Sequence, residues 1–342
     1  MATQRGVLCR TLAVMIKVYW VFYALILVLW GSACTTQEPV VGWATASAEA
    51  DTAIALVTIR AHAANATAIP TATTAQPTAV ATIAPTATPT LPPFVRQTSI
   101  GTSTAGHPID AWSIGYGRKI VVLIGGIHGG YEWNTVSLAY QLIDLYEARM
   151  SPVPQNITLV IIPVANPDGL ATVTGKAGRF DRADVSAERV QGRFNSNQVD
   201  LNRNWDCQWQ TEAVWSTRSV SGGTAPFSEA ESVVLRDYLA QLDPMVAIFY
   251  HSAADGIYTG QCGEDQHPDT LSFSKIYADA AGYNLNTAFS AYAITGDASD
   301  YLNRIGVPSF TVELTTVEAT EFEKNLAGVQ LLLTHISQRT SR

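Results

Sequence analysis

Residues 119–126 read KIVVLIGG, a short, largely apolar run that ends in two glycines. A run of this length without polar alternation is typical of a strand that is buried on both faces of a sheet. Three later runs have the same character: ITLVIIPV at 157–164, MVAIFY at 245–250 and PSFTVEL at 308–314. We therefore expect four buried strands in one central sheet.

The segments between these strands predict helices and turns. Apolar residues recur at helical spacing in residues 136–148, and a second helix is expected from Ser228, which is placed to form a capping box with Glu231. The Asn-Pro-Asp-Gly sequence at 166–169 predicts a turn. Buried strands that alternate with amphipathic helices predict an α/β domain, with a mostly parallel or mixed central sheet covered by helices on both faces. Ligands bind such folds at the carboxyl ends of the strands.

The first third of the chain has a different composition. Basic residues precede an apolar run at 18–30, and small residues then lead to Cys34. Residues 1–34 therefore read as a secretory signal of the lipoprotein type with Cys34 as the lipidated residue, and an uncleaved membrane anchor is the alternative. Residues 35–93 are rich in Ala, Thr and Pro, which predicts a disordered tether before a folded domain at 94–342. Either reading places that domain outside the cytoplasm, anchored at the cell surface, or secreted if the signal is cleaved.

The charge balance excludes one class of partner. The formal net charge is −8 at pH 7. A nucleic-acid-binding protein normally presents a basic face, so we expect no nucleic-acid partner. A small anionic group remains possible as a ligand, because a local arginine cluster can sit in an acidic protein.

Two of the four cysteines, Cys207 and Cys262, belong to the predicted folded domain. In an exported protein, a pair of cysteines suggests one disulfide. Both follow segments that we expect to meet at one face of the sheet, which favours the disulfide over two buried thiols.

Three residues suit a metal ion. His128 and Glu132 follow the strand at 119–126, in GGIHGGYEWNT, where glycines allow the chain to turn sharply. His251 follows the strand at 245–250. Imidazole and carboxylate are typical zinc ligands, and a catalytic zinc site has three of them and one open position. The His–Glu pair alone fits a capped turn equally well, and His267 is the only plausible substitute for His251.

Two further segments carry groups suited to catalysis and binding. Residues 192–206, GRFNSNQVDLNRNWD, contain Arg193 and Arg203, whose fork geometry suits a carboxylate, although a solvated polar loop is the plain alternative. Glu313 lies within the apolar strand at 308–314. An acid in such a strand is costly unless it faces a polar site, so Glu313 is a candidate general base; the alternative is an acid that points to water.

Taken together and in this order, these residues resemble the zinc carboxypeptidase family, over most of residues 119–314. The resemblance rests on the His–Glu pair, the Asn-Pro-Asp-Gly sequence, the Asp-Leu-Asn-Arg-Asn segment at 200–204, His251, Tyr292 and Glu313. It implies a single zinc carboxypeptidase-like catalytic domain at 94–342.

The resemblance implies one Zn²⁺ per chain, held by His128, Glu132 and His251. Asp200 would accept a hydrogen bond from His128 and fix its tautomer. The family usually has two residues between the first His and the Glu, whereas this chain has three.

The resemblance also assigns the substrate-binding and catalytic groups. Asn202 and Arg203 would hold the terminal carboxylate of a peptide. Arg193 would polarise the scissile carbonyl, Tyr292 would close over the substrate, and Glu313 would be the general base for a zinc-activated water.

The predicted function is therefore that of a zinc metallocarboxypeptidase acting on peptides. A peptidoglycan-peptide amidase or carboxypeptidase of the same fold is the second reading. Ser299 falls where the family has its side-chain pocket, and a small neutral residue there predicts neither a basic nor an acidic preference. The third reading is an inactive zinc- or peptide-binding surface protein.

Overall fold

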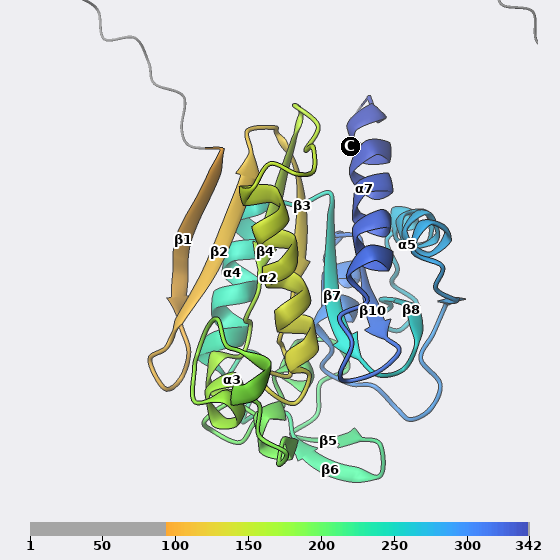
Figure 1. The fold of residues 1–342 in the computed structure, drawn as a ribbon. Helices are drawn as coiled ribbons and strands as arrows, with labels where there is room; N and C mark the ends of the chain where they lie inside the picture. The colour runs from red at the N-terminus through yellow and green to blue at the C-terminus, as the bar shows by residue number, and fades with distance from the viewer. Residues whose placement is uncertain (1–93, 341–342) are drawn as a thin grey trace, which may run out of the picture. The chain divides into compact units, whose positions relative to one another are not determined.

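The computed structural model describes residues 94–340, which fold around one eight-stranded sheet (Figure 1). In chain order its strands are β1 (Val95–Thr102), β2 (Pro108–Gly115), β3 (Lys119–Ile124), β4 (Ile157–Ile162), β7 (Val246–Ser252), β8 (Gly256–Thr259), β9 (Leu285–Asn286) and β10 (Ser309–Leu314). Across the sheet the order is β1-β2-β4-β3-β7-β10-β8-β9. A separate two-stranded hairpin consists of β5 (Glu212–Trp215) and β6 (Arg218–Ser221).

The four strands expected from the sequence form the parallel centre of this sheet. Strands β4, β3, β7 and β10 are neighbours and run parallel. Antiparallel strands extend the sheet at both sides, with β2 on β4, β1 on β2 and β8 on β10. The sheet is therefore mixed, and the predicted α/β class is confirmed.

Helices cover both faces of the sheet, as expected. They are α2 (Trp133–Glu147), α3 (Pro167–Thr174), α4 (Ala230–Leu242), α5 (Pro268–Ala281), α6 (Ala298–Arg304) and α7 (Phe322–Gln338). Three short 3₁₀ turns occupy Arg182–Asp184, Val190–Arg193 and Leu201–Arg203. Figure 1 shows α2 in front of the sheet and α4 behind it.

Two hydrophobic cores result from the alternation of side chains along the strands. In β3, Val121 and Leu123 pack into the core that contains α2, α5 and α7, whereas Val122 and Ile124 pack into the core that contains α4 and α6. All four side chains are essentially buried. Because both faces are covered, the strand is apolar throughout, which explains the continuous run in the sequence.

Two local expectations were wrong. The Asn-Pro-Asp-Gly sequence does not form an isolated turn but begins helix α3, with the Asn166 side chain accepting a hydrogen bond from the Gly169 amide at 2.8 Å. The capping box is absent from α4, which starts at Ala230. Ser228 instead donates to Glu229, while the carboxylate of Glu231 accepts hydrogen bonds from the backbone and side chain of Thr104. Tertiary partners therefore overrode the local signal.

The expectations for residues 1–34 and 35–93, Cys34 included, lie outside the described residues. Within residues 94–340, no helix has both the length and the apolar character needed to cross a membrane.

Candidate active site

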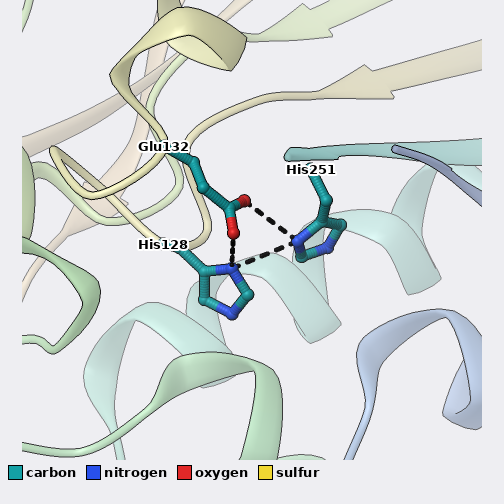
Figure 2. Close-up of side chains that lie close together, drawn as sticks. All are labelled: His128, Glu132 and His251. Atoms are coloured by element: carbon teal, nitrogen blue, oxygen red, sulfur yellow. Dashed lines mark hydrogen bonds and ion pairs between the residues drawn. The ribbon is translucent and has the colours of Figure 1, made fainter. Parts of the chain in front are cut away.

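Three side chains meet at the carboxyl ends of the central strands (Figure 2). His128 Nδ1 lies 2.7 Å from Glu132 Oε1, and His251 Nδ1 lies 3.2 Å from Glu132 Oε2. The two Nδ1 atoms are 3.2 Å apart. All three residues are buried, at 3–4% exposure. One ligand atom from each lies within 4.8 Å of the others, which is a spacing that a single metal ion can bridge.

The extra residue between His128 and Glu132 is absorbed in the glycine turn. Gly129 has a φ of +46°, and a Cβ atom there would meet the Gly192 carbonyl oxygen at 2.6 Å and the Gly169 backbone at 2.8 Å. Only glycine combines this backbone conformation with such close packing. The chain then enters α2 with Glu132 as its N-cap residue. The longer spacing therefore still brings the imidazole and the carboxylate together.

The surroundings of His128 define its tautomer. Arg193 Nη1 lies 3.2 Å from His128 Nδ1, and because a guanidinium only donates, Nδ1 is an acceptor and the proton belongs on Nε2. Nε2 faces Asp200 Oδ1 at 3.4 Å, within ion-pair reach but without hydrogen-bond geometry, and it has no other partner in the described part of the chain. The second oxygen of Asp200 accepts a hydrogen bond from Arg193 Nε at 2.8 Å.

Electrostatics keep these groups in their metal-binding forms. Burial raises the pKa of Glu132, but the adjacent His128 and His251 outweigh it and hold that pKa below its usual range. Burial lowers the pKa of His251. For Asp200 too, burial opposes ionisation, and Arg193 and His128 nevertheless lower its pKa. An ionised Glu132 carboxylate, together with a His251 imidazole that burial makes harder to protonate, suits the binding of a metal ion.

This donor set fits zinc. Two imidazoles and one carboxylate converge in a buried site, where a bound cation would compensate the negative charge of Glu132. Two imidazoles and one carboxylate leave a fourth position open, as in catalytic zinc sites.

A cavity of about 590 Å³ opens beside these ligands. Nine of the residues singled out from the sequence line it: His128, Glu132, Arg193, Asn202, Arg203, His251, Tyr292, Ser299 and Glu313. Asp200 lies behind the wall, against His128 and Arg193. The alternative ligand His267 is not part of the wall; it caps α5, where its Nδ1 accepts a hydrogen bond from the Asp269 amide.

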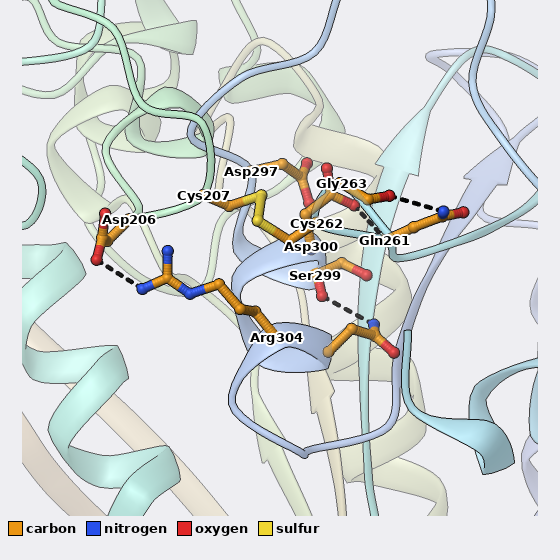
Figure 3. Close-up of a disulfide and its surroundings, with 10 residues drawn as sticks. Asp206, Cys207, Gln261, Cys262, Gly263, Asp297, Ser299, Asp300 and Arg304 are labelled. Carbon is orange, nitrogen blue, oxygen red and sulfur yellow. Dashed lines mark hydrogen bonds and ion pairs between the residues drawn. A yellow bond between two sulfur atoms is a disulfide. The ribbon is translucent and has the colours of Figure 1, made fainter. Parts of the chain in front are cut away.

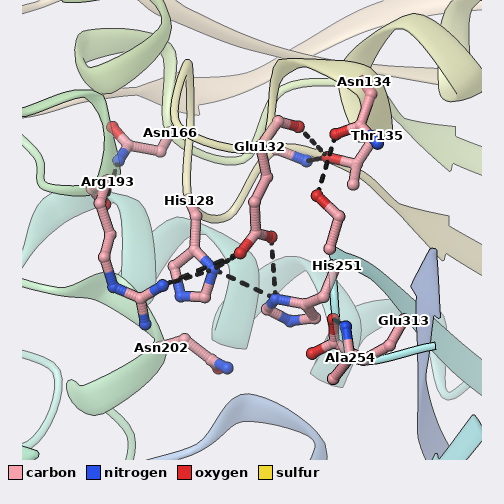
Figure 4. A network of polar contacts seen from close by, with 12 residues as sticks. His128, Glu132, Asn134, Thr135, Asn166, Arg193, Asn202, His251, Ala254 and Glu313 are labelled. Carbon is pink, nitrogen blue, oxygen red and sulfur yellow. Dashed lines mark hydrogen bonds and ion pairs between the residues drawn. The ribbon is translucent and has the colours of Figure 1, made fainter. Parts of the chain in front are cut away.

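Glu313 faces this cavity from β10 (Figure 4). Val312 and Leu314, its neighbours in the strand, point into the core on the other face. One carboxylate oxygen of Glu313 accepts a hydrogen bond from the Ala254 amide at 3.1 Å. Burial and the nearby charge of Glu132 raise the pKa of Glu313 to about 8. A carboxyl group of this kind can exchange a proton near neutral pH.

The Asn202–Arg203 pair forms another part of the wall. Arg203 is only 2% exposed. Its Nε donates to the Val214 carbonyl at 3.1 Å and its Nη1 to the Asn202 carbonyl at 2.6 Å. Two hydrogen bonds to backbone carbonyls leave the positive charge without a carboxylate partner among the described residues. An anionic group entering the cavity would supply that partner.

Tyr292 and Phe289 also line the cavity, with ring centroids 4.9 Å apart. Burial raises the pKa of Tyr292, so its hydroxyl stays protonated and can donate a hydrogen bond.

The two cysteines of the domain form a disulfide (Figure 3). Cys207 comes four residues after Arg203, and Cys262 comes three residues after β8. The bond joins the Arg203 segment to Gln261, which also lines the cavity. The sequence-based pairing thus places a covalent link at the active-site face.

The structure adds two aromatic residues that the sequence analysis did not single out. Trp215, on the short hairpin, lines the cavity together with Tyr131, and their ring centroids are 5.0 Å apart. The guanidinium carbon of Arg193 lies 4.4 Å from the Trp215 ring centroid. A four-residue strand has no informative periodicity, so nothing in the sequence indicated Trp215. For Tyr131, its position between two metal-ligand candidates was the available signal.

The comparisons with known proteins agree with this geometry. The model of the zinc carboxypeptidase family matches residues 86–330. Among curated proteins, γ-D-glutamyl-L-diamino acid endopeptidase 1 of Lysinibacillus sphaericus is 24% identical over 65% of this chain and 61% of its own length. Carboxypeptidase B of Helicoverpa zea is 27% identical over 58% of this chain and 51% of its own length. The chain thus spans little more than half the length of these relatives.

Solved structures show the same fold. The carboxypeptidase A structure from Helicoverpa armigera is 22% identical and superposes with a TM-score of 0.57, covering 73% of this chain and 70% of the other. Bovine thrombin-activatable fibrinolysis inhibitor, solved with a tick carboxypeptidase inhibitor, is 20% identical with a TM-score of 0.58, covering 71% and 90%. Because the family model matches well over half of the sequence, this chain belongs to the zinc carboxypeptidase family.

Proposed function

We propose that this protein is a zinc-dependent metallocarboxypeptidase that removes the C-terminal residue of peptides. The observation that carries the proposal is the convergence, in one cavity, of the His128–Glu132–His251 group, the buried Arg203 and the Glu313 carboxyl. A metal site can activate water for hydrolysis, a buried arginine can bind the terminal carboxylate of a peptide, and a carboxyl group can transfer the proton.

His128 Nδ1, His251 Nδ1 and the Glu132 carboxylate would hold the zinc ion. Zinc bound there would lower the pKa of water towards about 7 and polarise a carbonyl group. Asp200 serves this site by facing His128 Nε2, which keeps the Nδ1 lone pair directed at the metal position.

Glu313 is the proposed proton carrier. It accepts the proton of the attacking water and later delivers it to the leaving amine. The Ala254 amide fixes one of its oxygens, which leaves the other available to the cavity.

Arg203 and Asn202 are proposed to bind the terminal carboxylate of the substrate. Arg193 is proposed to stabilise the negative charge that develops on the scissile carbonyl, since its guanidinium lies beside the metal ligands. Tyr292, which lines the cavity, is proposed to close over the bound substrate.

Zinc analysis combined with peptide hydrolysis by the full chain tests this function. We expect one zinc per chain and cleavage of peptides with a free C-terminus, with no cleavage when the terminal carboxylate is amidated or when zinc is removed by a chelator. Zinc binding without cleavage of any peptide or muropeptide would instead support an inactive binding protein. Absence of bound zinc would overturn the proposal.

A peptidoglycan peptide is the second candidate substrate. The relative from Lysinibacillus sphaericus is named for cleavage of γ-D-glutamyl-L-diamino acid bonds. Parallel digestion of muropeptides and ordinary peptides, with both products quantified, separates the two substrates.

We also propose that the protein works outside the cytoplasm, tethered through its N-terminal segment. The apolar run at 18–30 followed by Cys34 supports this location, and a disulfide is typical of oxidising compartments. Metabolic labelling with a fatty acid tests it: Cys34→Ala should abolish the label and release the protein from the membrane fraction. A label that persists in this variant would exclude Cys34 as the lipid attachment site.

A further inference from the structure

One part of the cavity wall is acidic and serves neither the metal ligands nor the proton carrier. It consists of Asp297, Ser299 and Asp300, at the start of α6, and we refer to these three residues as the acidic corner. Figure 3 shows them beside the disulfide and Gln261.

The two carboxylates of the acidic corner bond only to neutral donors. Asp297 Oδ2 accepts a hydrogen bond from Asn202 Nδ2 at 2.7 Å, and Oδ1 accepts one from the Asp300 amide at 3.0 Å. Asp300 Oδ1 accepts one from the Gln261 amide at 2.7 Å. Within residues 94–340, neither carboxylate forms an ion pair with a lysine or arginine. Two acids therefore face one cavity without a counter-charge in contact.

The third member of the corner is an unsatisfied hydroxyl. Ser299 is 2% exposed, and its Oγ has no hydrogen-bond partner among the described residues. It lies in the cavity wall next to Gly260, where the absence of a side chain leaves room for it: a Cβ at Gly260 would come within 2.3 Å of this oxygen. A buried polar atom without a partner is uncommon and points to a ligand that would complete it.

The environment of Asp300 also favours a cation. Burial and the adjacent Asp297 raise the pKa of Asp300 to about 8, because two carboxylates so close together resist ionising at the same time. A bound positive charge would offset the repulsion between the two carboxylates and allow both of them to ionise.

When a substrate occupies the cavity, the charges that line the cavity determine which substrate side chain can bind in the acidic corner. This step rests on the proposed function, in which Arg203 is neutralised by the substrate's terminal carboxylate. Asn202 connects the two regions: its backbone carbonyl accepts from Arg203, while its side chain donates to Asp297. The acidic corner therefore lies next to the carboxylate anchor, where the side chain of the terminal residue would extend.

We propose that the acidic corner selects substrates whose C-terminal residue carries an ammonium group on its side chain, as lysine and other diamino acids do. The ammonium has three N–H donors, and the corner offers three acceptors, one each from Asp297, Asp300 and Ser299. This assignment differs from the expectation that a neutral residue at 299 gives no charge preference, because the charge is contributed by the residues on either side of it.

The test uses three peptides that differ only at the C-terminal residue: lysine, Nε-acetyl-lysine and norleucine. Norleucine keeps the carbon chain and lacks the amine, and the acetylated residue keeps the nitrogen and lacks the charge. We expect the full chain with zinc to cleave the lysine peptide with a kcat/KM about tenfold to a hundredfold above that of the other two, the range of one charge-assisted hydrogen-bond set. Equal values for lysine and norleucine would overturn the proposal.

Variants locate the selectivity. In Asp297→Asn and in Asp300→Asn, the ratio of kcat/KM for lysine over norleucine should fall towards one. The measured quantity is this ratio and not the absolute rate. Asp297 also contacts Asn202, so its replacement can lower activity in general, and such a loss would affect both peptides equally. A ratio unchanged in both variants would overturn the assignment to these acids. The comparison of peptides on the unmodified protein stands even if a variant fails to fold.

Two further measurements test where the ammonium-bearing substrate comes from and whether the underlying carboxypeptidase function holds. A tripeptide ending in γ-D-glutamyl-lysine distinguishes a cell-wall source from an ordinary peptide ending in lysine, by which of the two is cleaved faster. Failure of all free-carboxylate peptides, norleucine included, would contradict the carboxypeptidase function itself. Cleavage of norleucine and lysine peptides at equal rates would leave that function standing and remove only the acidic-corner proposal.

Discussion

Glu313 on β10 lies directly opposite His251 on the neighbouring parallel strand β7. Side chains alternate along both strands, so residues in register point to the same face of the sheet. On that face, Glu313, Thr311 and His251 all line the cavity, while Tyr250 and Val312 are packed in the opposite core. The pairing register thus sets the carboxyl group beside a metal-ligand candidate without making it a ligand.

Replacement of Glu313 by Gln separates metal binding from turnover. The amide keeps the size of the side chain and removes its ability to take up a proton, so kcat should fall by at least about a hundredfold. Zinc content should remain at one per chain, because Glu313 is outside the His128–Glu132–His251 group. Activity and metal content are measured on the same sample, with Glu318→Gln at the exposed surface as control. Near-normal turnover in Glu313→Gln would remove Glu313 from the mechanism.

The centre of the fold was predictable because its signals are local. Each central strand is a largely apolar run. The metal-ligand candidates His128 and Glu132 come after the end of β3, and His251 is the penultimate residue of β7. Where strands are parallel neighbours, residues at their carboxyl ends must meet, so His128 and His251 could be placed together from the sequence alone.

The outer elements were not predictable in this way. Strand β1 has the sequence VRQTSIGT, and most of its residues are exposed, so it contains no apolar run that would predict a strand. Ser228 has the right spacing for a capping box, but the side chain of Asn204 donates to its hydroxyl at 3.0 Å and the box does not form. Trp215 reaches the cavity through hairpin geometry alone. In each case the deciding partner is far away in the sequence.

Replacement of Arg203 by Lys tests recognition of the chain end. Lysine keeps the charge but loses the planar fork, so two-point binding of a carboxylate is lost. We expect kcat/KM for peptides with a free C-terminus to fall by about tenfold or more, mainly through a higher KM. Arg304→Lys is the matched control, since Arg304 pairs with Asp206 at the surface. An unchanged KM in Arg203→Lys would contradict the anchoring role.

Removal of the disulfide should affect both stability and the cavity. The bond closes a loop of 55 residues, and the double variant Cys207→Ser, Cys262→Ser should lose about 2–4 kcal/mol of unfolding free energy. Because the bond ties the Arg203 segment to Gln261, KM should rise more than kcat falls. Urea unfolding and steady-state kinetics measure the two effects. A change in stability with unaltered KM would show that the cavity wall holds its shape without the bond.

Asp168 at the start of α3 should make stability depend on pH in the acid range. Its carboxylate accepts hydrogen bonds from Ser103, from Ser196 Oγ at 2.8 Å and from the Ala105 amide at 3.0 Å, and it lies 2.9 Å from His107 Nδ1. Burial opposes ionisation, but these hydrogen bonds outweigh it and hold the pKa of Asp168 at about 2, against 3.8 ordinarily. A carboxyl group with a lowered pKa in the folded state stabilises the protein fully above its ordinary pKa. That contribution is lost as the pH falls from about 4 to about 2.

Asp168→Asn should therefore be less stable than the unmodified protein at pH 7, by about 1–3 kcal/mol, because an amide cannot accept the same set of donors. The difference should narrow as the pH falls through the range from 4 to 2, where the unmodified carboxylate takes up its proton. Denaturant unfolding at a series of pH values measures it. Asp144→Asn is the control: Asp144 is more than half exposed and pairs with Arg179 at the surface, where such pairs contribute little. A difference between Asp168→Asn and the unmodified protein that stays constant from pH 7 to pH 2 would show that the contribution of Asp168 does not depend on its charge.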